Sequence, residues 1–256
     1  MRPHIVFACT NYGPLWAPAV ESWLRCVIKT ARQYAVEYPL GQLALEPGRG
    51  GLVATGISDR CYTAASENKQ IQGFLALPEA THLFWCESDM CLPDDAILKL
   101  LEVDKDIVSG VYYLRDGWGA PCLYKQVVKM RRERADQVQY GHTPVTVFPQ
   151  TVPFKLGDKR SSGVPGFGCV LIKRQVLEAM TPPWCQQRDG AGGYGSDMYF
   201  YKHACEAGFE VWVQPAVQCG QIDYTVFTVE DYHDRLQQDP DFARSGYIIG
   251  LPEGTP

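Results

Sequence analysis

The stretch Thr81-His82-Leu83-Phe84-Trp85-Cys86-Glu87-Ser88-Asp89-Met90 decides the fold of this chain. It has the pattern of a short buried strand that ends in two carboxylates one residue apart. Side chains at positions i and i+2 of an extended segment point the same way, so we expect Glu87 and Asp89 to project together. Ligands of α/β sheets bind at strand ends. Paired carboxylates there suit Mg²⁺ or Mn²⁺, and such an ion can hold a substrate diphosphate.

Composition sets the broad class of protein. The 256 residues, 46% of them hydrophobic, are enough for one substantial core. A net charge of −5 argues against binding nucleic acid or acidic membranes through bulk electrostatics. Ten cysteines without C-x-x-C spacing favour buried thiols in a reducing compartment, with a disulfide or zinc framework as the alternative. Without a signal-peptide pattern or a long apolar stretch, we expect no membrane span and a cytoplasmic location.

Strand and helix patterns alternate along the chain. This rhythm predicts an α/β fold with a largely parallel sheet. Residues 125–147 break the rhythm, and we interpret them as an antiparallel excursion or a flexible insertion. We expect one domain over residues 1–220, with a possible insertion at 120–160, and a C-terminal surface tail over 221–256. Besides the carboxylate strand, the sequence predicts strands at 4–9, 106–113, 166–172 and, as the last clear strand, 211–213, and helices at 17–34, 59–77, 96–102, 174–180 and 196–207.

Four separated segments resemble one family, the nucleotide-sugar glycosyltransferases of GT-A fold, in a family-2-like form. They occur in the expected order and cover most of the chain. The resemblance implies a Rossmann-like, mostly parallel central sheet flanked by helices. The segments are Glu87-Ser88-Asp89-Met90 with Leu92-Pro93-Asp94-Asp95, Lys105-Asp106-Ile107-Val108-Ser109-Gly110-Val111-Tyr112-Tyr113, Gly166-Phe167-Gly168-Cys169-Val170-Leu171-Ile172-Lys173-Arg174, and Gly195-Ser196-Asp197-Met198-Tyr199-Phe200 with Ala207-Gly208-Phe209.

The resemblance implies roles for individual residues. Asp89 matches the second Asp of the D-x-D motif, which binds the divalent metal, and Glu87 matches the first, which faces the ribose or the metal. Asp197 matches the catalytic base that deprotonates the acceptor hydroxyl in inverting members. The donor nucleotide is expected at Thr10, Tyr12, Arg60, Asn68 and Ser88, together with Glu87.

Three positions depart from the family pattern. Glu87 replaces an Asp, and Ser196 replaces the acidic residue that precedes the base. Gln221 occupies the place of a metal-binding His, and Gln is a poorer ligand for transition metals. We therefore expect Gln221 or Asp223 to complete the metal site, with His233 as another substitute, or else diphosphate and water, which suits Mg²⁺.

Each site residue also has a purely structural interpretation. Glu87 and Asp89 could be a solvated strand end, and Asp197 could cap the helix that follows it. Arg60 could form an ordinary helix salt bridge, and Gln221 and Asp223 could form loop hydrogen bonds. Trp184, in a Gly/Pro-rich loop, is interpreted as an anchor, with sugar stacking as the alternative.

The hypothesis that follows is a metal-dependent glycosyltransferase that uses Mn²⁺ or Mg²⁺ and inverts the anomeric centre. We expect a UDP- or GDP-sugar as donor, and the acceptor can be a glycan, a small molecule or a modified polymer, DNA included. One alternative is a nucleotidyltransferase, although Thr10-Asn11-Tyr12-Gly13-Pro14 does not resemble a phosphate-binding loop. The other is a sugar- or nucleotide-binding protein that has kept the fold and lost the chemistry.

Overall fold

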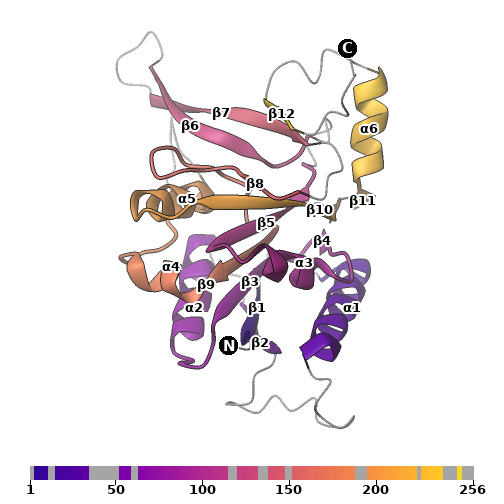
Figure 1. Cartoon of the computed structure of the whole chain (residues 1–256), viewed down its shortest axis with the longest axis vertical. Coiled ribbons are helices and arrows are strands. Elements are labelled where there is room, and N and C mark those ends of the chain that lie inside the picture. The colour runs from indigo at the N-terminus through magenta and orange to yellow at the C-terminus, as the bar shows by residue number, and fades with distance from the viewer. Residues whose placement is uncertain are drawn as a thin grey trace.

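Strands and helices alternate through most of the chain in a computed structural model (Figure 1). This pattern confirms the predicted α/β fold. The structure describes residues 3–10, 15–34, 52–58, 63–114, 120–131, 138–147, 152–187, 195–223, 226–238 and 247–249.

The main sheet is mixed, and its described part has nine strands. Strands β2, β1 and β3 are parallel neighbours, and β5 runs parallel to β10. Strand β9 lies antiparallel between β3 and β5 and so joins these two groups. The order is β11-β10-β5-β9-β3-β1-β2, with β4 and β8 also paired to β10, and the bounds are Ile5–Thr10 (β1), Leu52–Ser58 (β2), His82–Glu87 (β3), Met90–Cys91 (β4), Ile107–Tyr112 (β5), Phe154–Lys155 (β8), Cys169–Lys173 (β9), Val211–Ile222 (β10) and Val226–Phe227 (β11).

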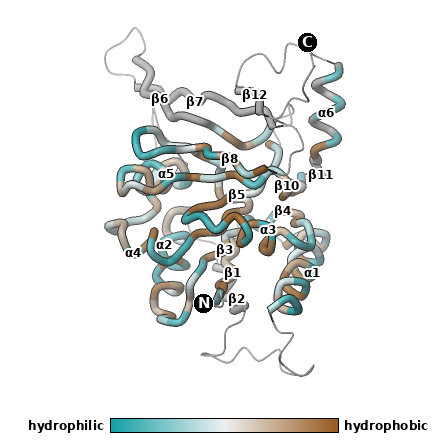
Figure 2. The backbone as a smooth tube through the Cα atoms, in the orientation of Figure 1, coloured by the Kyte–Doolittle hydropathy of each residue, from teal (hydrophilic) through white to brown (hydrophobic). Residues whose placement is uncertain are grey.

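Helices cover both faces of this sheet because the strands carry apolar side chains on both faces. In β3, Leu83 and Trp85 pack with α2, α4 and α5, whereas Phe84 and Cys86 pack with α1 and α3. Figure 2 shows hydrophobic residues gathered in the central strands and a mostly hydrophilic α6. The helix bounds are Ala17–Tyr34 (α1), Thr63–Leu75 (α2), Ala96–Val103 (α3), Arg174–Ala179 (α4), Ser196–Glu206 (α5) and Val229–Gln238 (α6).

A second, three-stranded sheet contains the predicted antiparallel excursion. Strand β6 (Tyr124–Arg131) pairs antiparallel with β7 (Val138–Val147), and β12 (Tyr247–Ile249) runs parallel to β7. This sheet lies beyond the β8 and β10 side of the main sheet, at the top of Figure 1. The antiparallel interpretation of residues 125–147 is therefore confirmed.

One strand prediction is wrong, and one strand was not predicted. The strand that begins at Val211 does not end at Val213 but continues to Ile222, with a register shift against β5 between Val213 and Gln218. Pro215 lies within that shift and has no N–H to donate to a strand ladder, which explains the break in the sequence pattern. Strand β2 was not predicted, since its Gly56 weakens an already short pattern.

None of the described helices combines the length and the apolar character needed to cross a membrane.

Candidate active site

The candidate site lies where the first three parallel strands end. In the register of the sheet, Thr10 at the end of β1 is opposite both Ser58 at the end of β2 and Glu87 at the end of β3. Strand β9 begins beside them, and the Glu87 N–H points to the carbonyl of Gly168 at 3.4 Å. The polar residues after β3 therefore stand at one edge of the sheet, as parallel strand ends require.

The chain bends immediately after this strand. Glu87 is the last residue of β3, and Ser88 and Asp89 form a turn, so the premise of one extended segment through both carboxylates is wrong. Both carboxylates nevertheless act on one buried group: burial raises the pKa of the Cys9 thiol to about 12, and the charges of Glu87 and Asp89 contribute to that rise. The two carboxylates thus converge near the end of β1, by the turn rather than by strand alternation.

Asp89 is fixed by contacts to β10. The Gln221 amide nitrogen, Nε2, donates to Asp89 Oδ2 at 3.2 Å, and the Ile222 N–H donates to the Asp89 carbonyl at 2.8 Å. The next residues are held from the other side of the turn, since the Trp23 indole N–H of α1 donates to the Met90 carbonyl at 2.7 Å. The metal-ligand candidates Asp89 and Gln221 are therefore brought together across 132 residues of sequence.

The donor atoms at this position suit a hard divalent cation. Gln221 is only 6% exposed, and its oxygen, Oε1, is buried without a hydrogen-bond partner among the described residues. Turning the amide would direct this oxygen toward the Asp89 carboxylate, an arrangement that is repulsive alone and favourable around a cation. In the described part of the chain, no three His, Cys, Asp and Glu side chains are grouped to hold a metal, so Asp223 does not join Glu87 and Asp89. Oxygens from a diphosphate and water would have to complete the coordination.

Gly166 and Gly168 leave room for the Tyr112 side chain to pack against the backbone that leads into β9. A Cβ at Gly168 would lie 2.6 Å from the Tyr112 ring and 2.9 Å from the Met90 sulfur. Gly166 has φ of +67°, and a side chain there would collide with the Tyr112 hydroxyl. Burial raises the pKa of Tyr112, with contributions from Cys122, Glu87 and Asp197. The charges of Glu87 and Asp197 thus both act on one buried hydroxyl.

Asp197 lies in the first turn of α5. Gly195 is the N-cap residue, and the Asp197 carboxylate folds back so that Oδ1 accepts a 2.7 Å hydrogen bond from the Met198 N–H. A side chain at position 195 would come against this oxygen, so the Asp197 carboxylate would have to turn away to make room for it. The positive end of the helix dipole favours a negative charge here. Capping and proton transfer are both compatible with this position.

A carboxylate that the sequence analysis missed lies beside Asp197. Glu67 of α2 is 2% exposed, and its Oε1 accepts a 2.9 Å hydrogen bond from the Ser196 hydroxyl. Burial raises the pKa of Glu67 to about 7, against the Ser196 hydrogen bond, and the charge of Asp197 raises it further. Glu67 thus adds a second carboxylate next to Asp197 from another helix.

Asn68 has a structural role in the described structure. Its Nδ2 donates to the carbonyls of Ala64 and Cys185 at 2.6 and 2.7 Å, and its Oδ1 accepts from the N–H groups of Trp184 and Cys185 at 2.9 and 3.2 Å. These contacts use the whole hydrogen-bonding capacity of an amide, so we remove Asn68 from the expected nucleotide site.

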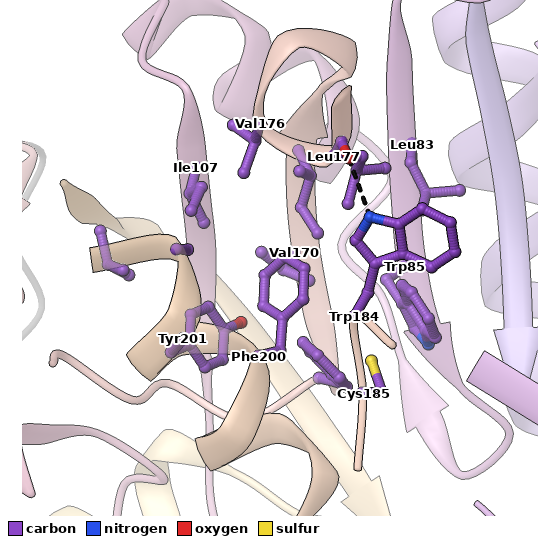
Figure 3. Packing of buried hydrophobic residues seen from close by; sticks show 14 of the residues in the cluster. Leu83, Trp85, Ile107, Val170, Val176, Leu177, Trp184, Cys185, Phe200 and Tyr201 are labelled. Carbon is purple, nitrogen blue, oxygen red and sulfur yellow. Dashed lines mark hydrogen bonds between the residues drawn. The ribbon is translucent and has the colours of Figure 1, made fainter. Parts of the chain in front are cut away.

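Trp184 is an anchor in the core. Its indole N–H donates to the Leu177 carbonyl at 2.8 Å, and Figure 3 shows the ring beside Trp85 and Leu83. This contact agrees with the interpretation as an anchor and does not support sugar stacking.

The remaining candidates are placed only in part. Tyr12 and Arg60 lie outside the described residues, as does the side chain of Thr10. Ser88 is buried within the turn, Asp223 directly follows β10, and His233 lies on α6. The donor-binding roles of Thr10, Tyr12, Arg60 and Ser88 stay predictions, as do the metal-binding roles of Asp223 and His233.

Comparisons with known proteins support the fold. No family model matches the sequence, and no curated protein matches it. Among solved structures, A197 from STIV has a TM-score of 0.52 at 14% identity and covers 86% of each chain. GalNAc-T7, in a structure with UDP, GalNAc and Mn²⁺, has a TM-score of 0.53 at 10% identity. That alignment covers 92% of this chain and 48% of GalNAc-T7, so this chain spans about half of that protein's length.

At 10–14% identity these similarities establish the fold and leave the activity open. The fold agrees with the strand order and with the helices on both faces of the sheet. The protein therefore has the mixed α/β fold of the GT-A type.

Proposed function

We propose that the protein is a metal-dependent glycosyltransferase that moves a sugar from a nucleotide-sugar donor to an acceptor hydroxyl. The observation that carries the proposal is the contact of Asp89 with Gln221 at the carboxyl end of β3, beside Glu87. A carboxylate and an amide side chain that meet at the strand ends, where α/β sheets bind ligands, support a cation site there. A neighbour with the same fold holds UDP, GalNAc and Mn²⁺, which supports a nucleotide-sugar substrate.

Asp89, Glu87 and the Gln221 oxygen are the groups that would hold Mg²⁺ or Mn²⁺. The bound cation would neutralise the donor diphosphate as it leaves. The chain's own contribution is to fix the position of Asp89 through β10 and α1, so that this carboxylate does not have to be ordered when the donor binds.

Asp197 is the proposed base. It would accept the proton of the acceptor hydroxyl while that oxygen bonds to the anomeric carbon and the nucleoside diphosphate leaves. One base and one in-line displacement predict inversion at the anomeric carbon. Its place at the N-terminus of α5 keeps the carboxylate oriented through the Met198 N–H.

A binding experiment tests the proposal. UDP-, GDP-, CMP- and dTDP-sugars are each added with Mn²⁺, Mg²⁺ or EDTA, and the melting temperature is measured for wild type, Asp89→Ala and the exposed control Asp234→Ala. A ligand that binds the folded state raises the melting temperature. We expect a metal-dependent rise with a UDP- or GDP-sugar that Asp89→Ala abolishes and Asp234→Ala keeps. A flat response to every donor would contradict the assignment of Glu87 and Asp89.

Turnover separates the alternatives. With the donor that binds, a glycosyltransferase releases nucleoside diphosphate in the presence of an acceptor, and slowly by hydrolysis without one. A nucleotidyltransferase instead releases pyrophosphate from a nucleoside triphosphate and a sugar phosphate. A protein that binds the donor and releases neither product would be a binding protein with this fold.

A further inference from the structure

Glu67 and Asp197 meet at the N-terminus of α5, and we call them the helix-start pair. Glu67 reaches this place from the buried face of α2. It lies two turns before Phe74, which packs in the hydrophobic core. The Ser196 hydroxyl donates to Glu67 Oε1, and Asp197 is the next residue in the first turn of α5. The second oxygen, Glu67 Oε2, is buried with no hydrogen-bond partner among the described residues.

Burying an ionised carboxylate at this position lowers the folding stability, so the presence of Glu67 there indicates a function. A carboxylate that is 2% exposed loses most of its hydration, and structural burial alone would be served better by an apolar residue or by glutamine. The groups that face Glu67 are the Asp197 carboxylate from α5, the Ser196 hydroxyl and the Cys185 thiol. In the described part of the chain, no lysine or arginine is among the groups that shift its pKa. Its strongest electrostatic partner of like charge is therefore the proposed base.

We propose that Glu67, which is hydrogen-bonded to Ser196, and the following residue Asp197 act as one carboxylate pair, in which Glu67 is a positioning residue that makes Asp197 a stronger base. This inference rests on the proposed function, because it assigns the proton that the acceptor hydroxyl releases. Two neighbouring carboxylates hold a first proton more tightly than either would alone, since that proton removes their mutual repulsion.

The proton balance is simple. The fully ionised pair takes one proton from the acceptor hydroxyl at Asp197, while the acceptor oxygen forms its bond to the anomeric carbon and the diphosphate leaves. The pair then carries one proton and one negative charge. Release of the proton to solvent restores the fully ionised pair.

The pair predicts the pH dependence of transfer. Because the pKa of Glu67 is raised to about 7, the fully ionised form is lost below neutral pH, and we expect kcat/KM to fall there with an apparent pKa near 7. In Glu67→Gln the neutral amide still accepts from Ser196. We expect the acid limb to move to lower pH and the plateau to fall about 10-fold because Asp197 is a weaker base.

Two further variants separate charge from structure. Glu67→Asp keeps the charge, so we expect the acid limb to stay near neutral pH, whereas a merely structural role predicts no difference between Glu67→Gln and Glu67→Asp in the pH profile. Glu206→Gln, at the exposed far end of α5, is the control and should leave the profile unchanged. An acid limb at the same pH in wild type and Glu67→Gln would overturn the proposal.

A second readout needs no transfer activity. Carboxyl ¹³C NMR of the protein alone should show the Asp197 resonance responding in two steps, one of them in the pH range where Glu67 ionises. Glu67→Gln should remove that step. If both occur and no donor is ever turned over, the pair stands and the proposed function fails. If transfer is observed and Asp197 titrates identically in both proteins, the pair fails and the proposed function stands.

Discussion

The carboxylates at the end of β3 and those at the start of α5 differ in their surroundings. Glu87 and Asp89 are partly exposed in a turn, and Asp89 accepts a hydrogen bond from a neutral amide. Glu67 is 2% exposed and faces another carboxylate. The comparison teaches that surroundings give one functional group different properties: a partly exposed carboxylate stays accessible to a cation, whereas a buried one is held close to protonation. Four variants test this difference.

The largest effect is expected at the end of β3. Asp89→Asn keeps the size of the side chain and an oxygen that can accept from Gln221, so the fold should be retained. It removes the charge that a divalent cation requires, and we expect a loss of transfer rate of about 10²–10³-fold, the range seen when one preorganised electrostatic group is deleted. A Mn²⁺ titration checks the cause, and unchanged Mn²⁺ affinity in Asp89→Asn would contradict the metal assignment.

The buried carboxylate should be visible in the stability of the protein. Between the ordinary pKa of 4.5 and the raised value of about 7, folded Glu67 keeps a proton that the unfolded chain releases, so stability falls as the pH rises. The fall amounts to about 3 kcal/mol across this window. Urea denaturation of wild type and Glu67→Gln at pH 4 to 8 measures it as a difference that grows with pH in favour of the variant. Parallel curves would show that Glu67 is not buried in this way.

A substitution at Asn68 tests whether this residue stabilises the fold or binds the donor nucleotide. Asn68→Ala removes four hydrogen bonds and leaves the Trp184 and Cys185 N–H groups without their acceptor, so we expect a loss of about 2–3 kcal/mol of stability. Chemical denaturation measures this loss, with the exposed Gln72→Ala on the same helix as control. Donor affinity should be unchanged at a temperature where the variant is folded. A weaker donor affinity at full stability would return Asn68 to the nucleotide site.

The smallest effect is expected at Gln221. Gln221→His replaces an amide by an imidazole, a ligand that transition metals prefer, so Mn²⁺ should gain about 10-fold over Mg²⁺ in affinity. Competition of the two ions for the protein measures the ratio, and Asp223→Ala serves as the neighbouring control. A ratio that changes in Asp223→Ala and not in Gln221→His would place the metal ligand after β10 instead of within it.

Sequence alone predicted the end of β3 because the information there is local. An apolar run followed by Glu87 and Asp89 indicates both a buried strand and the chemistry at its end, and the family resemblance adds Gln221 as a partner. The contact between Asp89 and Gln221 forms only because β10 extends to Ile222. The sequence pattern did not predict this extension, because Pro215 interrupts it. The turn at Ser88 was also missed, because alternation was assumed to continue past the last sheet hydrogen bond.

Glu67 could not be found by motif, because its partner Ser196 is 129 residues away. A weaker signal was present: Glu67 lies at helical spacing from Ile71 and Phe74, on the buried face of α2. A charged residue on an apolar helix face indicates either a buried partner or a functional group. The identity of that partner depends on how α2 and α5 pack, which only the tertiary structure supplies.

The antiparallel position of β9 has a consequence for how the chain folds. Within the described strands, β9 is the link between β2-β1-β3 and β5-β10, and it pairs Cys86 with Cys169 and Ile107 with Ile172. Strands β1, β2, β3 and β5 are synthesised before residues 169–173 and β10 after them, so β3 and β5 cannot be joined into one sheet until β9 emerges. Contacts of such long sequence separation slow folding. A growing chain therefore exposes the open edges of β3 and β5 to other chains until β9 closes the gap between them.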